Sequence, residues 1–110
     1  MFTELKVKDE TYKLRLNTRG VIQLEKALGY NPIDILMKIE DNIMPTLSDC
    51  MVILHACLQG YNHGFTLEKT FNLFDEFVAD GHTLFDLIPL FVDVFQECGL
   101  IELGGDQEKN

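Results

Sequence analysis

Residues 50–66, CMVILHACLQGYNHGFT, decide how this chain is organised. The first nine are apolar almost without interruption, and a helix that is apolar on every side belongs inside a protein. We expect Gly60 to end this helix in the left-handed conformation, and Asn62 and Gly64 to take turn positions with positive φ. Thr66 is a suitable N-cap for another helix. The stretch therefore predicts a buried helix, a fixed corner and the start of the next helix.

The same stretch raises the question of a metal or nucleophile site. At about 100° per residue, Cys50 and Cys57 share a helix face, whereas His55 points away from both and His63 lies beyond the helix end. The spacings C-x-x-C and H-x3-H, which are typical of structural zinc sites, do not occur here. A reactive thiolate needs an electropositive, partly open setting, and these cysteines lie among apolar residues in the acidic part of the chain. We expect no metal, no cofactor and no catalytic residue, and predict that the protein is not an enzyme.

Upstream of this stretch, the pattern has the period of a β-hairpin. Apolar residues alternate with lysines and an arginine over residues 3–16, with a polar break at residues 8–11. One face of the predicted hairpin carries Leu5, Val7, Tyr12, Leu14 and Leu16. An isolated hairpin is marginal in water, so we expect this face to rest on the helices.

From residue 18 to about residue 99 the pattern predicts five helices. Asn17 or Thr18 can cap the first, and Gly29 stands where a C-terminal glycine belongs. Asn31 followed by Pro32 restarts the chain as a second helix. The break at residues 44–46 separates it from the third helix, the buried one, for which Ser48 is the expected cap.

The last two helices carry most of the remaining apolar residues. In the fourth, we expect the face at i, i+4, i+7 and i+11 to pack on the core; its members are Leu67, Phe71, Phe74 and Val78. Thr83 opens the fifth segment, where Pro89 either kinks a helix or separates a short turn from a helix that starts at residue 89. That segment is apolar nearly all round, and a second such helix is hard to enclose in a domain this small, so we expect a partner or self-association. The alternative is that the third helix alone is central and the fifth is an ordinary amphipathic helix.

Composition indicates one domain. The chain has 110 residues, 46% of them hydrophobic, and a formal net charge of −9. We assign residues 1–100 to a mainly α (α+β) domain, a compact bundle of about five helices with an N-terminal β-hairpin, and residues 101–110 to a flexible acidic tail. Acidity of this size argues against nucleic-acid partners, and no apolar run reaches the roughly 18 residues that a membrane span needs. An alternative function is that of an acidic decoy, an inhibitor that mimics nucleic acid, although its carboxylates are scattered over several helices.

Three stretches together resemble a known family: LRLNTRGVIQLEKALGYNPIDILM at 14–37, LHACLQGYNHGFTLEKTFNLFDEFVADG at 54–81 and LIPLFVDVFQECGL at 87–100. Their order and spacing resemble those of the tail assembly chaperones of long-tailed phages and prophages of Gram-positive bacteria. The most specific pieces are residues 14–32 and 58–64. The resemblance covers roughly residues 11–100.

The resemblance implies a non-enzymatic protein that works in the host cytoplasm during phage assembly. Such chaperones are thought to coat the long, helical, apolar tape measure protein, while a longer form produced by ribosomal frameshifting recruits tail tube subunits. This chain would be the short form, with Gly104 and Gly105 in the region of slippage. Its expected partners are the tape measure protein and the tail tube protein.

A chaperone of this kind needs apolar contact residues of its own. Methionine side chains adapt to irregular partners, and phenylalanines on the fifth segment add area. The candidate partner-binding residues are Met37, Met44, Met51, Phe85, Phe91 and Phe95.

Overall fold

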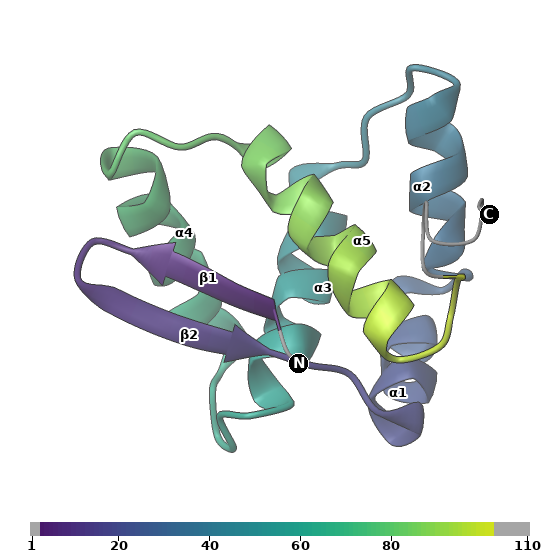
Figure 1. Ribbon diagram of the computed structural model, residues 1–110, viewed down its shortest axis with the longest axis horizontal. Helices are drawn as coiled ribbons and strands as arrows, with labels where there is room; N and C mark the ends of the chain where they lie inside the picture. Colours follow the sequence, from purple (N-terminus) through teal and green to yellow (C-terminus); the bar gives the residue numbers. More distant parts are fainter. Residues whose placement is uncertain (1–2, 103–110) are drawn as a thin grey trace, which may run out of the picture.

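A computed structural model of the chain describes residues 3–102 and orders them as a hairpin followed by helices (Figure 1). Strands β1 (Thr3–Val7) and β2 (Glu10–Leu14) pair antiparallel with Leu5 opposite Tyr12. Leu5, Val7 and Leu14 are buried, as their alternation predicts. The hairpin rests on helices through this face, so the mainly α architecture with an N-terminal hairpin is confirmed.

The first helix begins and ends as its local sequence indicates, whereas the second begins beside the predicted Asn31–Pro32 pair but ends at Glu40, before the predicted break at residues 44–46. Helix α1 (Thr18–Leu28) is capped by Asn17, whose Oδ1 accepts the Gly20 N–H at 2.8 Å, and ends at Gly29 with φ of 83°. Helix α2 (Ile33–Glu40) starts after Asn31, whose Oδ1 accepts the Ile33 N–H at 3.0 Å. These side chains satisfy N–H groups that have no partner inside the helix.

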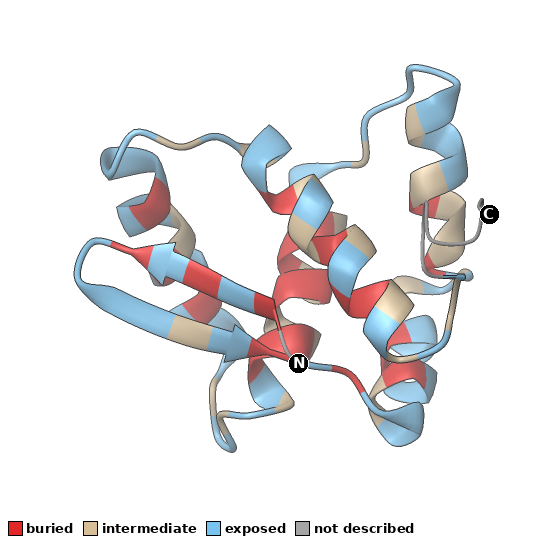
Figure 2. Cartoon of the chain, in the orientation of Figure 1, coloured by how far each residue is buried: buried red, intermediate tan, exposed pale blue. Residues whose placement is uncertain are grey.

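Helix α3 (Leu47–Gln59) is the central element of the fold. It contacts α1, helix α4 (Leu67–Ala79), β2 and helix α5 (Ile88–Glu97), and it buries six residues. Figure 2 shows these buried turns in the middle of the molecule, behind the hairpin and α5. The buried residues are Cys50, Met51, Ile53, Leu54, Cys57 and Leu58. The prediction of one helix enclosed by the others is confirmed.

The expected cap of α3 was wrong by two residues. Thr46, not Ser48, has the extended backbone of an N-cap, and its hydroxyl accepts the Asp49 N–H at 3.1 Å. Thr46 follows Pro45, which cannot continue a helix from upstream, so the helix can start directly after this pair. Ser48 already lies within the first turn.

The C-terminal segment divides at Pro89 in the second of the two predicted ways. A 3₁₀ turn, η1 (Leu84–Leu87), follows Thr83, and α5 begins at Ile88 with Pro89 in its first turn. There the missing proline N–H costs no helix hydrogen bond. Helix α5 crosses in front of α3 in Figure 1 and buries Phe91, Val94 and Phe95.

The predicted flexible tail lies outside the described residues except for Ile101 and Glu102. Ile101 is partly buried against the core, and its N–H donates to the Phe95 carbonyl at 3.4 Å. The folded part of the chain therefore reaches slightly further than residue 100. Across the described part, no helix has the length and apolar content to cross a bilayer.

Candidate functional site

The cysteines of the corner are packing residues. Cys50 and Cys57 are fully buried on one face of α3, and each is a free thiol. Burial raises the pKa of Cys50 to about 11 and raises that of Cys57 still more strongly. Both thiols therefore stay protonated at neutral pH, when a nucleophile or metal ligand would have to be a thiolate.

The two histidines do not join them. His55 Nε2 lies 2.8 Å from the Phe65 carbonyl oxygen, so this ring ties α3 to the residue before the Thr66 cap. His63 is exposed on the loop. Within residues 3–102, no three His, Cys, Asp or Glu side chains come close enough together to hold a metal ion.

Gly60 has a different role from the one predicted. Its φ of −59° is right-handed, so the expected left-handed ending was wrong. A Cβ at this position would lie 2.1 Å from the Arg15 carbonyl oxygen. Gly60 is required because the end of α3 presses against the segment that leaves β2, where the Arg15 N–H also donates to the Cys57 carbonyl at 3.0 Å.

The loop after Gly60 turns through one left-handed glycine. Gly64 has φ of 82°, as predicted, whereas Asn62 is not among the residues with positive φ. The Asn62 side chain instead donates to the Leu58 carbonyl at 2.8 Å, and the Asn62 backbone N–H donates to the same oxygen at 2.9 Å. This amide contact holds the corner and was not visible in the sequence pattern.

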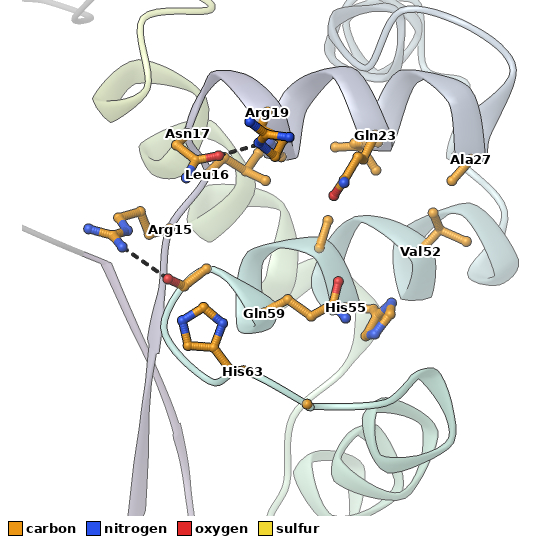
Figure 3. Close-up of a pocket in the computed structure, with 15 residues that line it drawn as sticks. Arg15, Leu16, Asn17, Arg19, Gln23, Ala27, Val52, His55, Gln59 and His63 are labelled. Atoms are coloured by element: carbon orange, nitrogen blue, oxygen red, sulfur yellow. Dashed lines mark hydrogen bonds between the residues drawn. The ribbon is translucent and has the colours of Figure 1, made fainter.

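A cavity of about 470 Å³ lies between α1, α3 and this corner. In Figure 3, Gln23 from α1 and Gln59 from α3 extend into the space between the two helices, above His63. Arg15 and Arg19 also line the cavity, and Arg15 donates to the Gly60 carbonyl at 3.1 Å. The lining holds no carboxylate, hydroxyl or thiol side chain. It therefore offers hydrogen-bond donors but lacks the nucleophile and carboxylate of a catalytic triad.

The six candidate partner-binding residues divide into two groups. Met37, Met44 and Phe85 are exposed, with Phe85 at 65%. Met51, Phe91 and Phe95 are buried at 3%, 0% and 0%, so their assignment as contact residues was wrong. They lie where α3, α5 and the hairpin pack together, and they form part of the hydrophobic core of the domain.

The largest departure from the sequence prediction is in α4. The face expected in the core is largely exposed: Leu67 at 37%, Phe71 at 41% and Val78 at 47%, with Phe74 half-buried. The residues that α4 buries are Thr70, Leu73 and Phe77. At about 100° per residue, this buried edge lies roughly a quarter turn round the helix from the exposed one. Together the two edges form an apolar arc of about 160°, which is wider than packing against one neighbouring element requires. This width is the feature of the sequence that could have indicated an uncovered edge.

Other exposed apolar side chains lie on the connection between α2 and α3 and at Leu47, the first residue of α3. Ile43 and Leu47 are about half exposed and flank Met44 in sequence. Asn42, with φ of 65°, turns the chain just before them. Exposed apolar side chains therefore occur in several regions of the molecule, which include α4, the α2–α3 connection, α2 at Met37, α1 at Ile22 and η1.

Neither the curated proteins nor the solved structures include a match to this chain. One protein family does match, over residues 3–110, and its description is a family of unknown function, DUF6096. The match includes the hairpin, all five helices, the corner and the exposed face of α4. The chain therefore belongs to this family of unknown function, DUF6096.

Proposed function

We propose that this protein is a phage tail assembly chaperone. It binds apolar helical segments of the tape measure protein in the host cytoplasm, and helps recruit tail tube subunits before the tail polymerises. It is the short form of a frameshifted pair. The sequence resemblance at residues 14–32 and 58–64 supports this assignment.

The observation that carries the proposal is exposed apolar surface on an acidic chain. Among residues 3–102, ten large apolar side chains are at least 37% exposed, and they include Met37, Met44 and Phe85. Single exposed apolar residues are ordinary, but a helix that leaves a whole apolar face uncovered is typical of a protein that binds another. The net charge of −9 supports solubility of a complex with an apolar partner.

The direct test is co-expression with the tape measure protein encoded in the same phage or prophage. We expect the chaperone to raise the soluble yield of that protein and to copurify with it. A triple variant, Met37→Gln, Met44→Gln and Phe85→Gln, removes exposed apolar surface away from α4, and we expect it to lower the yield in part. An unchanged soluble yield with the unmodified chaperone, together with no copurification, would refute the proposal.

A further inference from the structure

The exposed face of α4 has the spacing of a coiled-coil seam. Leu67, Phe71, Phe74 and Val78, called the α4 seam below, follow one another at intervals of four, three and four residues. In a heptad this is the sequence d, a, d, a, the pattern that packs against a second helix. At 1.5 Å per residue, the seam is about 16 Å long.

The α4 seam lies on a helix that is already ordered by the domain core and by its N-cap. Thr70, Leu73 and Phe77 fix the other edge of α4 in the core, and Thr66 caps its start by accepting the Lys69 N–H at 3.1 Å. Leu67, Phe71 and Val78 do not take part in the core that the described residues form, whereas Phe74 packs at its edge beside Phe77. A helix that is already ordered loses little conformational entropy when it binds, which favours even a short seam.

The outer border of the seam is acidic. Glu68 and Asp75 hold the two e positions next to it, and both are exposed. On the other border, the g positions are Thr70 and Phe77, which the domain core covers. Neither carboxylate has a salt-bridge partner among the described residues. A bound helix would thus meet apolar residues along its centre and negative charge along the one open border.

This border selects against a second copy of the chain. In an antiparallel pair of α4 helices, Glu68 of one copy would face Asp75 of the other, and like charges at such positions are destabilising. Each copy also carries a net charge of −9, which opposes their approach. A helix with lysine or arginine beside its apolar seam would instead meet both carboxylates favourably.

We propose that the α4 seam docks an amphipathic helix of a partner protein that carries an apolar heptad seam flanked by lysine or arginine. The inference rests on the proposed function in one respect, because it describes the segment of the partner that the chaperone binds. The seam itself is defined by the exposure and charge of α4 alone.

Two synthetic helical peptides test the proposal without any phage protein. Each is about 21 residues long, with leucine at a and d. One carries lysine at e and g, and the other carries glutamate. We expect the full chain to bind the lysine peptide about tenfold more tightly by calorimetry, and the difference to shrink in roughly 1 M salt, since screening weakens exposed charge pairs. The double variant E68K/D75K should reverse the preference.

The seam residues are tested with two variants that each replace an exposed apolar side chain, one on the α4 seam and one on α1. Phe71→Gln should weaken binding of the lysine peptide by about tenfold to a hundredfold, the loss expected for one buried phenylalanine contact. Ile22→Gln removes an apolar side chain of α1 that is 47% exposed, and it should leave binding unchanged. Circular dichroism should show both variants folded, as expected for exposed positions.

Three results would overturn the proposal. Equal binding of the two peptides would remove the charge argument. Loss of binding in Ile22→Gln but not in Phe71→Gln would place the contact elsewhere. A concentration-dependent dimer that Phe71→Gln abolishes would identify a second copy as the occupant. If the chain bound the lysine peptide but did not raise the soluble yield of the tape measure protein, the proposed function alone would be refuted. If it raised that yield but did not bind the lysine peptide, the α4 seam alone would be refuted.

Discussion

Helices α3 and α4 are equally long, yet the fold uses them differently. Each has 13 residues and begins after a threonine whose hydroxyl accepts the N–H of the third residue on. Helix α3 buries six residues because α1, α4, α5 and the hairpin surround it. Helix α4 lies at the margin, buries three residues and leaves an apolar face exposed.

Apolar side chains have different roles on α3 and on α4. On α3, apolar side chains stabilise the domain, and removing them should cost folding free energy. On α4, the exposed apolar side chains contribute little to folding and are available to a partner. Stability and binding should therefore respond to different substitutions, and the two helices provide the comparison.

The largest effect is expected from a cavity in α3. Leu54 is fully buried, and Leu54→Ala should lower the free energy of unfolding by about 2–5 kcal/mol, because it removes transfer free energy and leaves a void. Urea unfolding followed by circular dichroism measures the change. A loss below about 1 kcal/mol would contradict the central position of α3.

The corner between the helices should show a smaller effect. Gly60→Ala would place a Cβ against the Arg15 carbonyl and force the end of α3 away from β2, at about 1–3 kcal/mol. The control is Gly64→Ala, where no atom lies within 4 Å of the added Cβ and only the positive φ is strained, at roughly 1–2 kcal/mol. A larger loss at Gly64 than at Gly60 would mean that backbone conformation, rather than close approach, limits this corner.

Local signals made much of the fold predictable. Helix ends are marked by hydrogen bonds or ring geometry within a few residues at Asn17, Gly29, Thr66, Thr83 and Pro89. Gly29, Thr66 and Thr83 were predicted directly, whereas Asn17 and the break at Pro89 were each one of two predicted alternatives. The hairpin face was predictable because its period of two leaves one choice of buried side. Such features depend on neighbours in sequence, which a single chain displays.

The errors concern choices that depend on distant segments. The apolar arc of α4 is wide enough for two contacts, and only the position of α3 and the hairpin decides which edge is covered. Gly60 looked like a turn glycine, and only the approach of Arg15, 45 residues away in sequence, reveals its role. Met51, Phe91 and Phe95 resembled contact residues because composition does not say which apolar helix the domain encloses.

The start of α3 allows a test by pH. Tyr30 donates a 2.6 Å hydrogen bond to Asp49 Oδ2 in the first turn of α3. The pKa of Tyr30 is raised above 10.0, mainly by burial and secondly by this hydrogen bond. A raised folded-state pKa stabilises the fold at pH below the unfolded-state value, and this stabilisation is lost as the pH rises above about 10.

Tyr30→Phe should therefore cost about 1 kcal/mol at pH 8, the net value of one hydrogen bond. The difference in the free energy of unfolding between the variant and the unmodified protein should narrow at pH above about 10. At that pH, ionisation of Tyr30 stabilises the unfolded state of the unmodified protein. Urea unfolding of both proteins at two pH values measures this. A gap that widens with pH would contradict the raised pKa of Tyr30.

The smallest effect on stability should come from the exposed face of α4. Phe71→Gln replaces a residue that is 41% exposed and lies outside the core, so the free energy of unfolding should change by no more than about 0.5 kcal/mol. Phe77→Gln, two positions past Asp75 on the buried edge, is the control and should cost several times more, because it places an amide in the core. If Phe71→Gln destabilised the chain as much as Phe77→Gln, the exposed face would be part of the folding core and the contrast between α3 and α4 would fail. If it left stability unchanged but abolished peptide binding, folding and partner binding would be assigned to opposite edges of one helix.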